Sequence, residues 1–243
     1  MSHRSTHAHN GVLFLDELAE FPGSVIDSLR QPLEEGRVVV CRASASVAFP
    51  ARFLLVAAMN ACRCGADGSP GSCRCGEAAR ERYRARVSGP LLDRFDLRVR
   101  VQQPDFAALL SSPSAAKAGG GGETTSQVAA RVAKARQRAR DRGLRANADL
   151  ASWMLDEVAP LSLAARHLLE RRLSEGQLSA RALHRTRRVA LTVADVAGHD
   201  GALTEEHVLV ALALRGHNVF SDEACSGGLG APGDEACQLP KVS

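Results

Sequence analysis

The sequence lacks several features that would define a membrane or secreted protein. No stretch approaches the roughly 18 apolar residues of a membrane helix, and no apolar segment follows Met1 as in a signal peptide. The seven cysteines are an odd number, which is not typical of a secreted disulfide framework. The formal net charge is only +4, so overall basicity does not indicate a nucleic-acid partner. We therefore expect a cytoplasmic protein without a membrane partner.

The first half of the chain alternates short apolar runs with segments of helical spacing. Val12–Leu15 and FLLVAAMN (53–60) are typical of buried parallel strands, and Leu97–Val101 predicts a third. Apolar residues at helical spacing over 26–33 predict a helix that ends at a glycine. VVVCR and VAFPAR, flanking ASAS, predict a hairpin over 37–52. This order favours an α/β fold with a mostly parallel sheet.

Composition divides the chain into five segments. Residues 1–10 are polar and His-rich, which predicts a disordered leader, and 11–110 form the α/β domain. Residues 111–126 are rich in Ser and Gly and predict a linker. Helical patterns fill 127–217, and the Gly-, Asp- and Ser-rich tail 218–243 is predicted to be disordered.

The helical segment predicts five helices. After one that begins near Val128, three more are expected over 149–158, 162–174 and 179–197, and Thr204 suits the cap of the fifth. Trp153, the only tryptophan, is expected in the core of this domain.

The run RVAKARQRARDRGLR (131–145) is strongly basic, with a single acid. We interpret it as the solvated face of the first helix, and binding to a nucleic-acid backbone is the alternative. No aromatic residue interrupts the run, so base stacking is not indicated.

Polar side chains follow two of the expected strands. Asp16 and Glu17 come directly after Val12–Leu15, and Asn60 ends FLLVAAMN. Ligands of parallel sheets bind beyond the carboxyl ends of the strands. There, Asp16 could hold Mg²⁺ through water and Glu17 could polarise an attacking water. Asn60 could orient the same water or the γ-phosphate of a bound nucleotide. Alternatively, the two acids only cap the helix that follows.

The motifs HNGVLFLDELAEF, LRQPLEEG, FPARF, AAMNACRCG, RYRARVSGPLLDR and SARALHR occur in this order. Together they resemble the magnesium-chelatase-like AAA+ ATPases, with the nearest likeness to the ComM/YifB subfamily, over roughly residues 9–216. The resemblance implies a partial AAA+ P-loop NTPase sheet followed by an all-helical lid. It also implies ATP and Mg²⁺ as cofactors, a hexameric ring of identical subunits, and a motor for DNA branch migration in recombination and natural transformation.

The resemblance also implies roles for individual residues. It assigns Walker B to Asp16 and Glu17, sensor 1 to Asn60, the arginine finger to Arg94 and sensor 2 to Arg181. Such guanidinium groups stabilise the charge of a transferring phosphoryl group. Alternatively, Arg94 forms a surface salt bridge to Asp93 or Asp96, and Arg181 is one more solvated residue of its helix.

No GxxxxGK[ST] phosphate loop occurs in these 243 residues, and the glycine run KAGGGGETT lacks the lysine. The chain therefore resembles the C-terminal part of such a protein, whether as a fragment, a mis-called start or a truncated gene. We expect it to be inactive in ATP hydrolysis alone. Two other functions stay open: a chelatase-type motor acting on protein partners, and a non-catalytic subunit or DNA-binding remnant that assembles with a full-length paralogue.

The segment 62–75 carries four cysteines as CxC-x₈-CxC: Cys62, Cys64, Cys73 and Cys75. Four thiolates around a turn-rich loop can surround Zn²⁺ tetrahedrally. The pairs are closer than in the usual CxxC pattern, and the alternative is four reduced thiols on a surface loop. The spacing alone does not decide between them.

Overall fold

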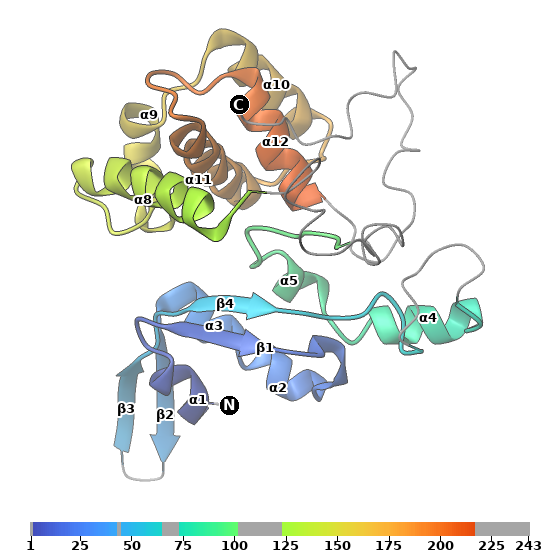
Figure 1. Ribbon diagram of the computed structural model, residues 1–243. Helices are drawn as coiled ribbons and strands as arrows, with labels where there is room; N and C mark the ends of the chain where they lie inside the picture. The colour runs from blue at the N-terminus through green and yellow to red at the C-terminus, as the bar shows by residue number, and fades with distance from the viewer. Residues whose placement is uncertain (1, 43–44, 65–72, 102–122, 217–243) are drawn as a thin grey trace. The chain divides into compact units, whose positions relative to one another are not determined.

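The computed structural model describes residues 2–42, 45–64, 73–101 and 123–216, which form two compact units (Figure 1). Unit 1 ends at Phe95 and unit 2 begins at Asp96. The predicted α/β class is confirmed as a small parallel sheet with helices. Residues 111–122 of the expected linker and the tail 218–243 lie outside the described residues. Among the described helices, none is both long and apolar enough to cross a membrane.

Unit 1 contains the strands and six short helical segments. Its elements are α1 (Ser2–His7), β1 (Val12–Leu15), η1 (Leu18–Glu20), α2 (Gly23–Asp27), α3 (Arg30–Glu35), β2 (Arg37–Arg42), β3 (Ala45–Pro50), β4 (Leu54–Ala57), α4 (Glu77–Arg84) and α5 (Gly89–Leu92). Strands β1 and β4 pair in parallel, with Leu15 opposite Ala57. Strands β2 and β3 pair antiparallel, which confirms the predicted hairpin.

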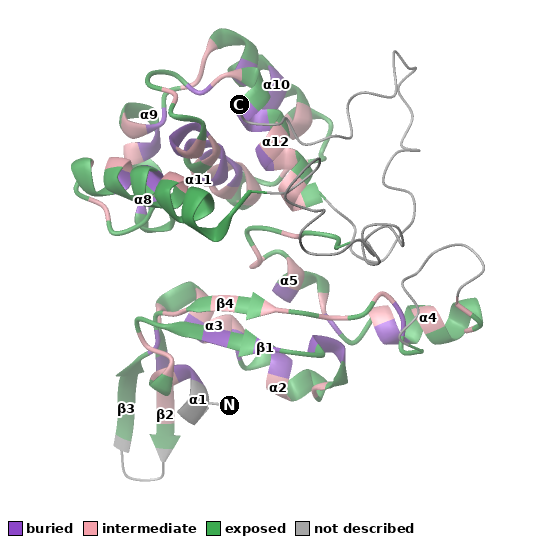
Figure 2. Ribbon diagram, viewed as in Figure 1, coloured by how far each residue is buried: buried purple, intermediate pink, exposed green. Residues whose placement is uncertain are grey.

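Within the part of the chain that the structure describes, the parallel sheet is covered on one face. Successive side chains of a strand point to opposite faces, so Leu13 and Leu15 of β1 enter the core while Phe14 is exposed. The core of unit 1 also contains Leu18, Ile26, Leu29, Tyr83 and Leu91. Figure 2 shows the exposed positions along β1 and β4. The sequence predicted helices on both faces of the sheet. Among the described residues, helices pack against one of these faces.

Gly36 ends α3, as the sequence predicted. Its φ of +66° is in the left-handed region, which glycine adopts without steric cost, and its N–H donates to the carbonyl of Pro32 at 2.9 Å. A Cβ at this position would lie 2.7 Å from Cγ of Arg52. Only glycine therefore fits between α3 and the hairpin.

Two sequence predictions in this region are wrong. The leader 1–10, expected to be disordered, contains helix α1. The end of this segment is hydrogen-bonded to the residues after the hairpin, because the N–H of Arg52 donates to Nδ1 of His9 at 3.1 Å. The expected third strand, Leu97–Val101, has no strand partner among the described residues. Instead, the N–H of Arg98 donates to the carbonyl of Leu214 at 2.7 Å, so this segment is hydrogen-bonded to a helix of unit 2.

Unit 2 is helical. Its elements are α8 (Thr125–Asp141), η2 (Asn147–Asp149), η3 (Ser152–Met154), α9 (Leu155–Val158), α10 (Leu163–Ser174), α11 (Ala180–Ala197) and α12 (Glu205–Gly216). The core contains Leu150, Leu155, Leu169, Ala190, Leu203 and Val208. Hydroxyl groups cap the helices: Ser162 accepts from the N–H of Ala165, and Ser179 accepts from that of Ala182, both at 3.2 Å. The hydroxyl of Thr204, the cap that the sequence predicted, accepts from the N–H of His207 at 3.4 Å.

The predictions for unit 2 fail at three places. Helix α8 begins at Thr125, inside the expected linker, because Thr124 and Gln127 form a capping box there. The expected helix 149–158 is broken into η2, η3 and α9. Trp153 is 79 % exposed in the short η3 segment rather than in the core.

Candidate functional site

Asp16, Glu17 and Asn60 line one surface hollow of about 170 Å³ together with Ala58 and Met59. The hollow forms because β1 and β4 are parallel and end side by side. The residues that follow the two strands therefore lie at the same edge of the sheet. The N–H of Ala58 donates to the carbonyl of Leu15, and the N–H of Leu18 donates to that of Ala58, each at 2.9 Å. The sequence argument that these three polar residues meet is thus supported by the geometry.

Glu17 has a left-handed backbone, with φ 50° and ψ 48°. This conformation is costly for a residue with a Cβ, by roughly 1–2 kcal/mol, and it concentrates at functional sites. A carboxylate oxygen of Asp16 accepts a hydrogen bond from the N–H of Glu17 at 3.0 Å, which holds the turn. The two acids therefore form a turn at the strand end, and the N-cap of the next helix, η1, shows no side-chain hydrogen bond.

The donor set of the hollow fits Mg²⁺. Two carboxylates and an amide offer hard oxygen ligands, and the open hollow leaves room for the waters that this ion retains. Both acids are solvent-exposed, so their carboxylates are accessible to an ion from solution.

Arg94 lies just after α5, and 11 % of its side chain is exposed. Its guanidinium pairs with Glu34 of α3 at 2.6 Å, and it also donates to the carbonyl of Pro90. The ion pair with Glu34 is a contact that the sequence did not indicate, and the role of Arg94 as arginine finger stays a prediction. No signal in the sequence links these two residues, which are far apart along the chain.

Arg181 lies in the first turn of α11 and is exposed. Its basic neighbours on that helix have structural contacts within unit 2. Arg187 donates to the carbonyls of Leu155 and Ala159, at 2.8 and 3.0 Å, and Arg188 donates to that of Leu150 at 2.8 Å. The assignment of Arg181 as sensor 2 stays a prediction.

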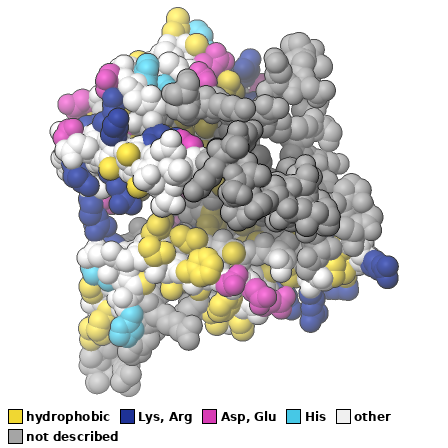
Figure 3. Space-filling model, viewed as in Figure 1, with side chains coloured by type: hydrophobic (Ala, Val, Ile, Leu, Met, Phe, Trp, Pro, Cys, Tyr) yellow, Lys and Arg dark blue, Asp and Glu magenta, His cyan; other side chains and the backbone are white. Residues whose placement is uncertain are grey.

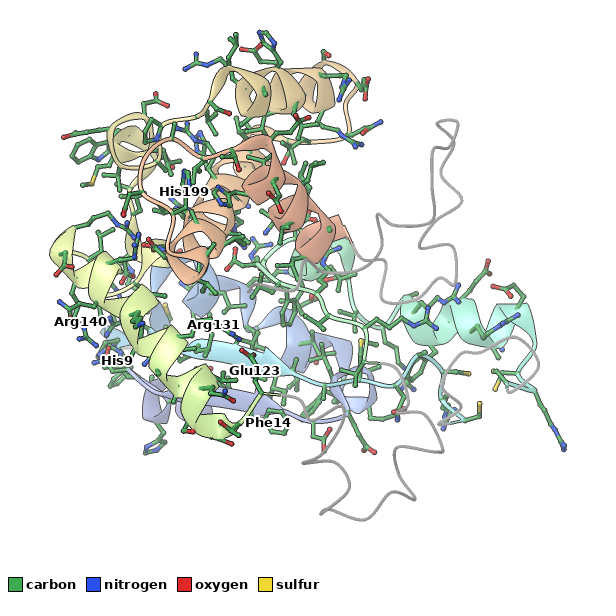
Figure 4. The ribbon with its side chains drawn as sticks, turned by 45° about the horizontal axis from the view of Figure 1, so that its top comes forward. His9, Phe14, Glu123, Arg131, Arg140 and His199 are labelled. Atoms are coloured by element: carbon green, nitrogen blue, oxygen red, sulfur yellow. The ribbon has the colours of Figure 1, made fainter. Side chains whose placement is uncertain are left out.

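The basic run on α8 has two faces. Arg142 pairs with buried Asp195, and Arg138 donates to the carbonyl of His199 at 3.0 Å and to the carboxylate of Asp200 at 2.7 Å. These contacts join α8 to α11 and the residues after it. Arg136 and Arg140 are exposed, and Figure 4 labels Arg140 on this helix. The run is thus only partly the solvated face that the sequence predicted.

The four cysteine sulfurs gather in one cluster, with all four Sγ atoms within 4.8 Å of one another. A hydrogen bond from the backbone of Cys64 lowers the pKa of the buried Cys62 thiol to about 7. Hydrogen bonds to the sulfurs of Cys62 and Cys64 raise the pKa of Cys75 to about 12. Within the cluster the Cys62 thiolate is thus favoured, and ionisation of Cys75 is opposed.

Comparison with known families gives matches in both units. The sequence pattern of "Magnesium chelatase, subunit ChlI" matches residues 4–109, and that of "Magnesium chelatase, subunit ChlI C-terminal" matches residues 122–215. The chain belongs to the magnesium chelatase ChlI family. Within it, Asp16, Glu17, Asn60 and Arg94 fall in the first matched region, and Arg181 falls in the second.

Curated relatives in this family are about 40 % identical to the chain. An uncharacterized protein of Mycobacterium tuberculosis is 42 % identical over 214 residues, which cover 86 % of this chain and 41 % of that protein. Competence protein ComM of Haemophilus influenzae is 41 % identical over 208 residues, covering 86 % and 39 %. The YifB protein of Escherichia coli is 39 % identical, covering 86 % and 40 %. The predicted likeness to ComM and YifB is confirmed, and the chain spans about two fifths of these relatives.

Proposed function

We propose that this chain supplies the water-activating half of a magnesium-dependent ATP hydrolysis site. The observation that carries the proposal is the meeting of Asp16, Glu17 and Asn60 in one hollow at the carboxyl ends of β1 and β4. Membership of the magnesium chelatase family supports ATP as the nucleotide. The phosphate-binding loop is contributed by a polypeptide region outside these 243 residues.

Each residue of the hollow has a distinct role in this proposal. Asp16 holds the ion through water, and Glu17 accepts a proton from the attacking water as general base. Asn60, on the neighbouring strand, orients that water by hydrogen bonding. When bound, Mg²⁺ draws charge from the phosphate oxygens. The fixed turn at Glu17 keeps its carboxylate aimed at the hollow before the nucleotide arrives.

Arg94 and Arg181 complete the site by adding positive charge near the phosphates. We assign Arg94 to the site of a neighbouring subunit in a hexameric ring, and Arg181 to the phosphates through the helical unit. In the single chain, the Arg94 guanidinium pairs with Glu34 of α3. This pairing has to be exchanged for the phosphate when a ring assembles.

The test joins this chain to an upstream region that carries a phosphate loop and measures ATP turnover. Glu17→Gln should lower turnover by about 10²–10⁴-fold while nucleotide binding persists, because only proton transfer is lost. Glu20→Gln is the matched control, since Glu20 pairs with Arg86 and does not line the hollow. The chain without the upstream region should show no turnover. Normal turnover in Glu17→Gln would contradict the assignment.

The same joined protein tests the ring. Arg94→Ala should lower turnover by on the order of 10³-fold, and mixing it with Glu17→Gln subunits should restore part of the activity. Restoration occurs because a mixed ring contains interfaces at which both side chains are present. Unchanged turnover in Arg94→Ala would show that the arginine only pairs with Glu34.

We propose DNA as the polymer on which the assembled motor acts. The Haemophilus influenzae relative is named a competence protein, and α8 exposes Arg136 and Arg140 for phosphate contacts. Binding of a fluorescent DNA duplex should weaken with salt, and Arg136→Gln/Arg140→Gln should reduce the logarithmic salt slope by about 2. Arg131→Gln is the control, because Arg131 pairs with Glu123 at the start of α8 (Figure 4). A slope unchanged in the double variant would remove α8 from the interface.

A further inference from the structure

The cysteine cluster of unit 1 has the composition of a metal centre. Cys62 and Cys64 follow β4, while Cys73 and Cys75 directly precede α4. Among the residues that the structure describes, no other group of three or more His, Cys, Asp or Glu side chains brings its ligand atoms this close together. Two separate stretches of chain thus direct four soft sulfur ligands to one point.

The distances fit a tetrahedral ion better than disulfide bonds. The Sγ of Cys73 is 3.2 Å from that of Cys62 and 3.6 Å from that of Cys64. In a tetrahedral site with Zn–S bonds of about 2.3 Å, neighbouring sulfurs lie about 3.8 Å apart. A disulfide requires about 2.05 Å, and all four of these cysteines are free thiols.

The surroundings of the cluster suit a closed site. Cys62 is 2 % exposed, so one side of the cluster is enclosed by the protein. Four thiolates around a dication carry a net charge of about −2. Each cysteine pair encloses one arginine, Arg63 or Arg74, and these two exposed cations offset that charge.

We propose that Cys62, Cys64, Cys73 and Cys75 bind one Zn²⁺ as a structural site that fastens the segment leaving β4 to the start of α4. With four protein ligands the coordination is complete, so no position is open for substrate and the ion has no catalytic role. Because the unfolded chain has no preformed site, the free energy of zinc binding adds to the folding free energy of this segment.

The primary test is the metal content of the full chain, purified without added metal and analysed by inductively coupled plasma mass spectrometry. We expect one zinc per chain. Cys64→Ser should lower zinc affinity by more than about 100-fold, since loss of even an outer-shell partner costs 10–100-fold. Cys41→Ser is the matched control, because Cys41 is exposed on the hairpin and lies outside the cluster. It should keep the full zinc content.

Two further measurements keep the proposal decidable if Cys64→Ser folds poorly. Cobalt added to the unmodified apo chain should give the intense visible absorption of tetrahedral thiolate coordination. Removal of zinc should speed hydrogen exchange in α4 and leave α11 of unit 2 unchanged. Zinc-free protein with four titratable thiols, two disulfides in the cluster, or a Cys64→Ser chain with full zinc content would each overturn the proposal.

Discussion

Unit 1 and unit 2 differ in how they bury apolar side chains. In unit 2, helices α10, α11 and α12 enclose a core with Leu169 and Leu203 at 2 % and 0 % exposure. In unit 1, the outer face of the parallel sheet leaves Val12, Phe14 and Leu54 between 58 % and 62 % exposed. Figure 3 shows hydrophobic side chains gathered at the surface of unit 1.

The difference follows from the backbone chemistry of the two units. A helix satisfies its hydrogen bonds locally and needs only one apolar stripe covered. A parallel sheet pairs residues that are distant in sequence and is normally covered on both faces. The described residues of unit 2 therefore close a core, whereas those of unit 1 cover half of a sheet. We expect unit 2 to be the more stable unit.

The largest effect is expected within the sheet itself. Leu15→Ala on the covered face should lower the unfolding free energy of unit 1 by about 3 kcal/mol, because it leaves a cavity beside α2 and α3. Phe14→Ala, one residue away on the outer face, should change it by less than about 0.5 kcal/mol. Hydrogen exchange of peptides from β1 and β4 measures the loss of unfolding free energy in each of the two variants. Equal losses would show that the outer face is covered in solution.

A slightly smaller effect is expected in unit 2, where Asp195 accepts hydrogen bonds from Arg142 and Asn147. Asp195→Ala should cost about 3 kcal/mol or less, because it leaves the Arg142 and Asn147 donors without their acceptor. Asp200→Ala removes the exposed partner of Arg138 and should cost less than about 1 kcal/mol. Urea unfolding followed by far-ultraviolet circular dichroism compares them. Similar urea midpoints for the two variants would show that the buried Arg142–Asp195 pair stabilises unit 2 no more than the exposed Arg138–Asp200 pair.

The smallest effect concerns pH and again involves unit 2. Burial, together with the neighbouring His199 ring 4.8 Å away, lowers the pKa of His207 below its ordinary 6.5, and Glu206 acts in the opposite direction. The folded state therefore favours neutral His207, whose Nδ1 accepts from the N–H of Thr204 at 3.2 Å. Its contribution is complete above the ordinary pKa and is lost as pH falls through the lower folded pKa.

The measurement is the urea midpoint of unit 2 from about pH 8 to about pH 5. His207→Gln should decline less steeply with falling pH than the unmodified chain. His184→Gln, on the partly exposed part of α11, should keep the original decline. If both variants declined like the unmodified chain, His207 would not be the group that titrates.

Much of the candidate site could be predicted from the sequence because its signals are local. An apolar run ending in Asp16 and Glu17, and a second ending in Asn60, indicate strand ends without knowledge of the rest of the fold. Parallel pairing then makes them neighbours. The left-handed backbone of Glu17 has no such signal, since the residue is neither glycine nor asparagine.

By itself, the sequence determined what depends on near neighbours: the hairpin 37–52, the stop at Gly36, the cap at Thr204, and the motifs of the magnesium chelatase family. Tertiary structure decided what depends on distant partners. It paired Arg94 with Glu34, brought the two cysteine pairs together, and left Trp153 exposed. It also bonded Arg98, in the expected strand Leu97–Val101, to Leu214 of α12. The physical reason is that periodicity and capping act within a few residues, whereas salt-bridge partners, metal-ligand geometry and strand neighbours are set by packing between remote segments.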